Sequence, residues 1–226
     1  MGAGEVSTVW TQVRRAVDGS QEDRDAFGRR YLPLVREYLR RRWEGWWLAG
    51  SVDDAAQDVF VECFRPGGVL TRAEPGRGLR GLLVATARNV ARRHEESAAQ
   101  RRERTPHETA FLHAQPARED SLTALFDRRW AEATMAEAAG RMEQLARQAD
   151  DAGRQRFELL QLRFEEGLPI RDIAARWGLD PRQVHDAYAR ARREFHRCLR
   201  EVVAAHGGVA HSDLDRECQE LLDLLG

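Results

Sequence analysis

The stretch Ile170–Arg200, IRDIAARWGLDPRQVHDAYARARREFHRCLR, predicts two helices joined by a tight turn, the second helix long and rich in arginine. Gly178 suits the turn because glycine adopts positive φ at little cost. Asp180 is placed to cap the second helix, and Pro181 is tolerated in its first turn, where the missing N–H needs no partner. The side chains that give the first helix one apolar face are Ile170, Ile173, Ala174 and Trp177.

The second helix has an apolar and a polar side. Its apolar residues recur at helical spacing and are expected to pack on the first helix; they are Val184, Ala187, Tyr188 and Ala191. The polar residues near its start, expected to face away from the core, are Arg182, Gln183, His185, Asp186 and Arg190. A helix-turn-helix is a packed pair that presents one polar helix end to the major groove of DNA, so these five are candidate DNA-binding residues. An ordinary helical hairpin with a solvated arginine face is the alternative.

Composition places the chain among ordinary globular proteins, with 226 residues, 42% of them hydrophobic and 32% charged. No window approaches the roughly 18 apolar residues of a membrane span. The N-terminal MGAGEVSTVW lacks the basic and apolar regions of a secretory signal, so we expect a cytoplasmic protein with no membrane partner. Three widely spaced cysteines, Cys63, Cys198 and Cys218, favour neither a disulfide framework nor a zinc site.

The net charge of −1 conceals an uneven distribution. All 36 basic side chains are arginine, and they concentrate at 88–104 and 182–200. Two separate basic surfaces suit contacts with nucleic-acid phosphates. The C-terminal tail is acidic through Asp213, Asp215, Glu217, Glu220 and Asp223.

Helical apolar periodicity covers most of the chain and no alternating strand pattern stands out, which predicts an all-α fold. Between residues 97 and 121 the periodicity is lost and Pro106 and Pro116 occur, which predicts a flexible linker. We therefore expect two helical domains, 1–96 and 122–204, the second containing the helix-turn-helix. The acidic extension would occupy 205–226.

A helix predicted at Val52–Phe64, VDDAAQDVFVECF, has an acidic side. That side consists of Asp54, Gln57, Asp58, Val61 and Glu62. A di-metal centre would need matching Glu or Glu-x-x-His helices, which the sequence lacks. The remaining interpretations are a solvated acidic face and a surface that docks on a basic helix of a partner.

A second helix, predicted at Leu79–His94, LRGLLVATARNVARRH, carries polar residues outside its apolar stripe. They are Arg80, Arg88, Asn89, Arg92 and Arg93. Arginines so spaced can follow a phosphate backbone and asparagine can contact a base edge, although a charged solvent face is the alternative. The aromatic cluster Trp43, Trp46 and Trp47 is interpreted as core packing in preference to a stacking platform for bases.

No catalytic or cofactor-binding pattern is found. The loop before residue 79 lacks the Gly-Lys-Ser/Thr of a phosphate cradle, and His94-Glu95-Glu96 is followed by no second histidine at metalloprotease spacing. We therefore expect a protein that is not an enzyme and needs neither cofactor nor metal.

The order of these segments resembles the extracytoplasmic-function (ECF) group of the bacterial sigma-70 family of RNA polymerase sigma factors. AFGRRYLPLVREYLRRR, 26–42, is similar to the first helix of the family's region 2, and DDAAQDVF, 53–60, resembles its D-x-x-Q-[DE]-x-F signature. GRGLRGLLVATARNVARRH, 76–94, is similar to the helix that recognises and melts the −10 element, with Leu79 and Leu82 where the family usually has aromatics. FDRRWAEATMAEA, 126–138, and the acidic tail resemble a subgroup with a Phe-Asp-Arg-x-Trp segment.

The resemblance implies a function for each candidate surface. Polymerase docking on the β′ clamp helices would use Asp54, Gln57, Asp58 and Glu62. Binding of the −10 DNA would use Arg80, Arg88, Asn89, Arg92 and Arg93. The helix-turn-helix would correspond to region 4, which contacts the −35 element, and the β flap, promoter DNA and an anti-sigma factor are further implied partners. The alternatives are a helix-turn-helix regulator that never contacts polymerase, and a sigma-like decoy or adaptor.

Overall fold

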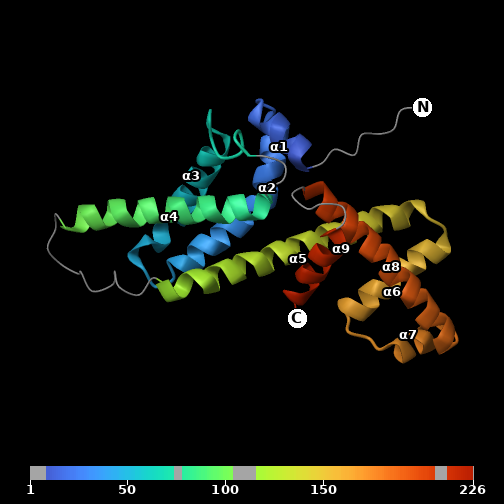
Figure 1. Ribbon diagram of the computed structural model, residues 1–226. Coiled ribbons are helices and arrows are strands. Elements are labelled where there is room, and N and C mark those ends of the chain that lie inside the picture. Colours follow the sequence, from blue (N-terminus) through green and yellow to red (C-terminus); the bar gives the residue numbers. More distant parts are fainter. Residues whose placement is uncertain (1–8, 74–77, 104–115, 207–212, 226) are drawn as a thin grey trace. The chain divides into compact units, whose positions relative to one another are not determined.

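A computed structural model describes residues 9–73, 78–103, 116–206 and 213–225. Over this part of the chain the secondary structure is helical with no strand, which confirms the all-α prediction. The chain divides into two compact units, and some helices contribute to both (Figure 1). The first unit takes residues 1–131, 204–211 and 221–226, and the second takes 132–203 and 212–220.

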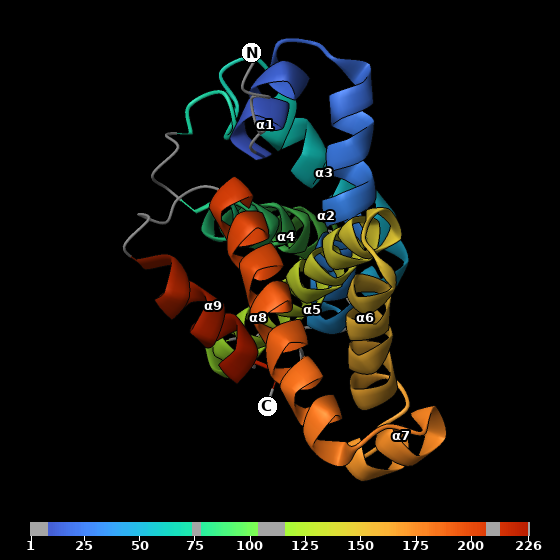
Figure 2. The same ribbon diagram turned by 90° about the vertical axis from the view of Figure 1, so that its right-hand side faces the viewer.

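The first unit is built around one long helix, α2, which packs against α1, α3 and α4. Figures 1 and 2 both show α4 alongside α2 and α3, and these two helices also pack on each other. The elements are α1 (Val9–Val17), α2 (Gln21–Arg42), the 3-10 helix η1 (Trp47–Ser51), α3 (Val52–Phe64), α4 (Leu79–Glu103) and the start of α5 (Pro116–Gln148).

Aromatic side chains form much of the core of this unit. Phe27 of α2 contacts Tyr31 and the rings of Phe60 and Phe64 on α3, with centroids 4.6 to 5.7 Å apart. Tyr31 also stacks on Trp130 of α5 at 5.3 Å. The start of α5 is thereby part of the same core as α2 and α3.

The tryptophan cluster separates into different environments. Trp43 is fully buried, as expected for core packing, and its indole Nε1 donates a hydrogen bond to Glu95 at 2.8 Å. Trp46 is half-buried, whereas Trp47 has 44% of its surface exposed. The three rings therefore do not form one stacking platform.

The second unit contains the rest of α5 together with α6, α7, most of α8 and the first part of α9. The bounds are α6 (Asp151–Phe164), α7 (Ile170–Trp177), α8 (Pro181–His206) and α9 (Leu214–Asp223). A compact apolar cluster joins α6, α7 and α8 through Leu159, Leu162, Ile173, Ala174 and Val184. Partly buried residues packed on it include Ile170, Trp177, Ala187 and Tyr188, so both apolar faces predicted for the Ile170–Arg200 stretch are confirmed.

The segment predicted as a linker differs from the structure at both ends. Helix α4 continues to Glu103, and α5 begins at Pro116, so 97–103 and 116–121 are helical. The apolar pattern fades there, but Ala98 is buried and the neighbouring residues are good helix formers, while proline is well tolerated at a first helical position. Residues 104–115 lie outside the described part of the chain.

The start of the second unit also differs from the sequence-based boundary at 122. Residues 122–131 of α5 belong to the first unit, because Phe126 packs edge-on against Tyr38 at 6.3 Å and Trp130 stacks on Tyr31. Among the described helices, none combines the length and apolar character needed to cross a membrane.

Candidate functional site

The turn between α7 and α8 depends on two residues, Gly178 and Asp180. Gly178 ends α7 in the left-handed conformation, with φ of 66°. Its N–H donates to the carbonyl of Ala175 at 3.3 Å. The carboxylate of Asp180 then accepts a hydrogen bond from the backbone N–H of Arg182 at 2.7 Å, which caps the start of α8 as predicted.

The first turns of α8 present a polar surface to solvent. All five residues predicted there are exposed, namely Arg182, Gln183, His185, Asp186 and Arg190. Further along the helix, Arg193 and Arg197 are exposed and Arg192 lies 5.9 Å from the ring of Tyr188. Within the described residues, Arg182, Arg193 and Arg197 form no ion pair, so their charges remain available to an anionic partner.

The arginines of α4 are in a different state, because three of the four predicted there are paired with carboxylates of the same unit. Arg80 lies 3.5 Å from Asp127 of α5, and Arg93 lies 2.7 Å from Glu62 of α3. Arg88 lies 2.9 Å from Glu119 of α5 and donates to the hydroxyl of Thr123 at 3.0 Å. The structure thus places the five predicted residues of α4 on different sides of the helix.

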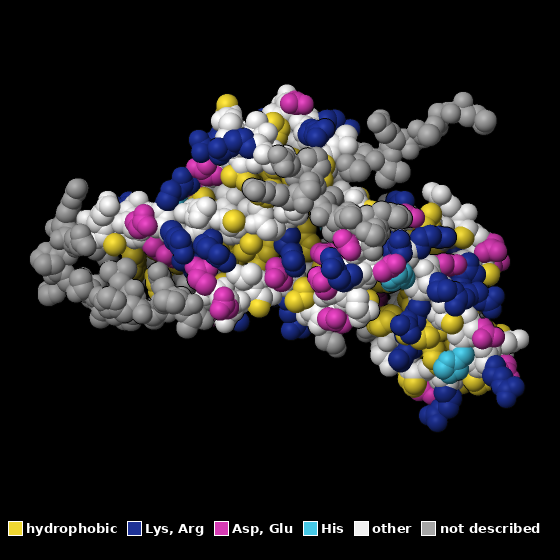
Figure 3. Space-filling view, viewed as in Figure 1, with side chains coloured by type: hydrophobic (Ala, Val, Ile, Leu, Met, Phe, Trp, Pro, Cys, Tyr) yellow, Lys and Arg dark blue, Asp and Glu magenta, His cyan; other side chains and the backbone are white. Residues whose placement is uncertain are grey.

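Three of those five residues face solvent. Asn89, Arg92 and Arg93 are exposed, although Arg93 is paired with Glu62, whereas Arg80 and Arg88 are half-buried. In Figure 3, acidic and basic side chains lie close together over α4 and α5, and basic side chains with some acidic ones among them lie around α7 and the start of α8.

A buried ionic network lies beneath α4, and it was not predicted from the sequence. Arg42 of α2 donates through Nε and Nη2 to both oxygens of Glu95 of α4, at 2.6 and 3.0 Å, and also to Glu119 of α5. Arg42 and Glu95 are each only 6% exposed. Partners this far apart along the chain have no local sequence signal that could have revealed them.

The charged groups of this network stabilise one another's charged forms. Burial on its own lowers the pKa of Arg42, but hydrogen bonds to Glu95 and Glu119 outweigh that effect and raise it. Burial likewise opposes ionisation of Glu119, yet Arg42, Arg88 and Arg92 together hold the pKa of this carboxyl below its usual value. The network is therefore charged, and it joins α2, α4 and α5.

The polar side of α3 is arranged as predicted. Asp54, Gln57 and Asp58 are exposed, and Val61 among them has 55% of its surface exposed. Glu62 is half-buried between Arg93 and Arg65, and the hydrogen bond from Arg93 lowers the pKa of Glu62. Glu62 is therefore less accessible to a partner than the other acidic residues of this face.

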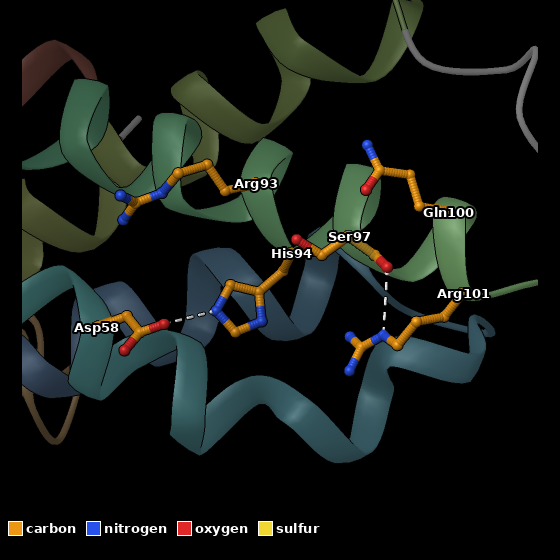
Figure 4. Close-up of a pocket in the computed structure, with 6 residues that line it drawn as sticks. All are labelled: Asp58, Arg93, His94, Ser97, Gln100 and Arg101. Carbon is orange, nitrogen blue, oxygen red and sulfur yellow. Dashed lines mark hydrogen bonds and ion pairs between the residues drawn. The ribbon is translucent and has the colours of Figure 1, made fainter.

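A groove of about 570 Å³ lies beside this face, between α3 and α4. Figure 4 shows the imidazole of His94 pointing to the carboxylate of Asp58, at 2.8 Å, and Arg101 turned to the backbone carbonyl of Ser97. The residues that line it are Asp58, Arg93, His94, Ser97, Gln100 and Arg101. Acidic and basic groups thus meet along the edge of the α3 face.

The acidic helix α9 pairs with the far part of α8. Asp215 forms an ion pair with Arg200 and lies 3.9 Å from His196. Arg200 is ten residues beyond Arg190, which corresponds to about 15 Å along a helix. This contact leaves the first turns of α8 uncovered.

Neither a metal-binding cluster nor an exposed thiol is found among the described residues. Over the described residues, no group of three or more His, Cys, Asp or Glu side chains is placed to hold a metal ion. All three cysteines are buried, and burial raises the pKa of Cys63 to about 12 and that of Cys218 to about 11. No protein-family model matches the chain, and no curated protein matches it.

Proposed function

We propose that this protein is an ECF-type sigma factor of the sigma-70 family, which binds core RNA polymerase in the cytoplasm and directs initiation at specific promoters. One observation carries the proposal most directly. The start of α8 is exposed, rich in arginine without acidic partners, and held by a glycine turn on the packed α7, as a helix-turn-helix requires. The protein would contribute binding and positioning, and polymerase would perform the chemistry.

In this function, α8 would contact the −35 element in the major groove. Arg182 and Gln183 lie in its first turn, where side chains of a recognition helix reach base edges, and His185, Asp186 and Arg190 follow on the exposed side. A good bidentate contact discriminates between bases by about 1–3 kcal/mol, so a few such contacts are enough for a promoter preference. Arg193 and Arg197 are placed to neutralise phosphates further along the duplex.

Polymerase would dock on α3. Its exposed carboxylates suit a basic helix, and the exposed Val61 among them supplies the apolar contact area that a stable protein interface needs. Asp54, Gln57 and Asp58 are the residues best placed for this contact, with Glu62 at its edge. The β flap, and an anti-sigma factor where one exists, remain proposals from the resemblance alone.

The test of this proposal is capture of bacterial core RNA polymerase by the tagged protein. Asp54→Arg and Asp58→Arg should each abolish capture, because they reverse charge on the exposed face of α3. Glu22→Arg is the matched control, since Glu22 is an exposed acid on another helix of the same unit. Retention of polymerase by both α3 variants would refute the docking surface.

A second experiment tests the DNA surface. Arg182→Ala and Gln183→Ala should weaken transcription from promoters that depend on a −35 element, while capture of core polymerase persists. Normal transcription by both variants from such a promoter would remove the major-groove assignment of α8.

A helix-turn-helix regulator that never contacts polymerase is the second candidate. It is favoured by the pairing of Arg80, Arg88 and Arg93 with carboxylates, which leaves α4 few free charges for the −10 DNA. Absence of polymerase capture by a well-folded protein, together with sequence-specific duplex binding that is lost in Arg182→Ala, would establish this candidate instead.

A further inference from the structure

The first part of α5 lies on the side of α4 that carries Arg80 and Arg88. We call residues 119–130 the α5 cover. Three of its polar residues contact α4: Glu119 and Thr123 hold Arg88, and Asp127 faces Arg80. These contacts recur at intervals of four residues, so they lie on one face of the α5 helix.

The α5 cover occupies the groups with which α4 would bind nucleic acid. A guanidinium binds a carboxylate and a phosphate through the same donors and in similar geometry, so one excludes the other at a given arginine. Arg80 is 35% exposed and Arg88 34% exposed while the carboxylates are in place. Two of the four arginines predicted to bind DNA on α4 are thus already bound to anions of the same chain.

The α5 cover is also anchored from below. Glu119 is shared between Arg88 and the buried Arg42, so it connects the arginine side of α4 with the ionic network under it. Phe126 and Trp130 are buried against Tyr38 and Tyr31 of α2. Exposed ion pairs contribute little on their own, but the burial of Phe126 and Trp130 holds this part of α5 in place, so its carboxylates stay beside Arg80 and Arg88.

We propose that the α5 cover is an internal acidic substitute for nucleic acid on α4, and that it must leave before Arg80 and Arg88 can contact single-stranded promoter DNA. This inference rests on the proposed function in so far as α4 is a DNA-binding helix. It adds that the free protein is held in a state with low affinity for that DNA. The Phe-Asp-Arg-x-Trp segment, which starts at Phe126, would then help to cover the DNA-binding arginines of α4.

The experiment compares the full-length protein with Asp127→Asn and with the double variant Glu119→Gln/Asp127→Asn. The probe is fluorescein-labelled single-stranded DNA of mixed sequence, and its anisotropy is followed over a range of salt concentrations. Each arginine that gains a phosphate should steepen the dependence of log Kobs on log salt by about 0.7. We expect an increase in affinity of about fivefold or more for the double variant, a steepening of about 1.4, and about half that steepening for Asp127→Asn.

Asp120→Asn is the matched control for Asp127→Asn, because Asp120 is exposed beside Glu119 and each of these two substitutions removes one negative charge. Adding Arg88→Ala to the double variant should reverse the gain that comes from Glu119. Hydrogen exchange of the backbone amides at 119–130 should accelerate in the double variant and not in Asp120→Asn. Circular dichroism establishes that each variant is folded. If the double variant does not fold without the Glu119 carboxylate, the single variant Asp127→Asn tests the proposal.

Two results would overturn the α5 cover. One is an equal gain in Asp120→Asn, which would mean that net charge alone controls affinity. The other is unchanged affinity and salt dependence in folded variants that still capture polymerase, and in that case the proposed function survives. If no form binds the probe, duplex DNA or core polymerase, the proposed function and the α5 cover both fail.

Discussion

Arg42 and Glu95 show how much of this structure depends on single side chains that are remote in sequence. The two residues are separated by 53 positions, yet they form a bidentate buried pair to which Trp43 adds a further hydrogen bond. A buried ion pair is not necessarily more stabilising than an apolar contact of equal size. Removing one member, however, leaves an uncompensated charge in the core.

Glu95→Ala should therefore lower the free energy of unfolding by about 3–5 kcal/mol, because it leaves Arg42 buried with only Glu119 to balance its charge. Urea denaturation followed by circular dichroism measures the change. The neighbouring Glu96 is exposed, so Glu96→Ala should alter stability by no more than about 0.5 kcal/mol. Similar effects of the two substitutions would show that the network does not support the unit.

The contributions of Glu119 and Asp127 to the stability of the first unit should change with pH in opposite directions. The pKa of Glu119 is lowered from 4.5, so its contribution is present above pH 4.5 and is lost as pH falls through the lower folded value. Burial raises the pKa of Asp127 above its usual 3.8, so its contribution is present below pH 3.8 and is lost as pH rises through the folded value.

Denaturation of the wild type and the single variants at several pH values between neutrality and about 3 would test these signs. Glu119→Gln should reduce the loss of stability on the acid side, and Asp127→Asn should increase it. Identical pH profiles for the two variants would contradict the assignment.

The residues that could be predicted are those whose environment is local. The exposed set at the start of α8 follows from helical spacing and from the turn at Gly178–Asp180. The partners of Arg80, Arg88 and Arg93 could not be predicted, because they lie on other helices and pairing across helices leaves no periodic pattern. An arginine free to bind DNA and an arginine held by a carboxylate look the same in one sequence.

At the scale of the element, the turn between α7 and α8 depends on one backbone conformation. Gly178 has φ of 66°, a region that costs a residue with a Cβ about 1–2 kcal/mol. Gly178→Ala should lower the free energy of unfolding of the second unit by that amount. It should also weaken duplex binding, since the turn sets the direction of α8.

Gly140→Ala is the control, because Gly140 is helical, exposed and has open space where a Cβ would be added. Alanine in a helix interior is up to about 1 kcal/mol more favourable than glycine, so this substitution should stabilise the protein. Thermal melts of both variants suffice. Equal destabilisation would mean that the left-handed turn is not what Gly178 contributes.

Element bounds were predictable where the apolar pattern was strong. Helix α3 begins and ends at the predicted residues Val52 and Phe64, and the turn at Gly178 separates α7 from α8 as expected. Helix α4 extends nine residues beyond its predicted end at His94, because polar helix formers continue a helix without marking it by periodicity. The boundary at 122 differs because Phe126 and Trp130 find aromatic partners on α2.

For the molecule as a whole, the net charge of −1 does not indicate how strongly the protein binds a polyanion such as DNA. The relevant quantity is the number of arginines without a carboxylate partner, and in the described residues several of these are on α8. Binding to duplex DNA should weaken with salt, with a slope that falls by about 0.9 for each phosphate contact removed.

Arg193→Ala should therefore flatten the salt dependence of duplex binding by about 0.9 for any sequence, whereas Arg182→Ala should mainly alter sequence preference. Electrophoretic mobility shifts on two unrelated duplexes at several salt concentrations separate these effects. Equal, sequence-independent losses in both variants would reduce α8 to a general phosphate-binding helix.

The stacking of Trp130 on Tyr31 also makes the first unit optically informative. An indole that is 6% exposed and 5.3 Å from a phenol ring emits at shorter wavelength than one in water, and the neighbouring ring changes its yield. Departure of the first part of α5 would hydrate that indole, whereas Trp43 would stay buried. Trp130 is thus an intrinsic fluorophore at the place where α5 would separate from α2. Its emission would follow that separation in real time without a label.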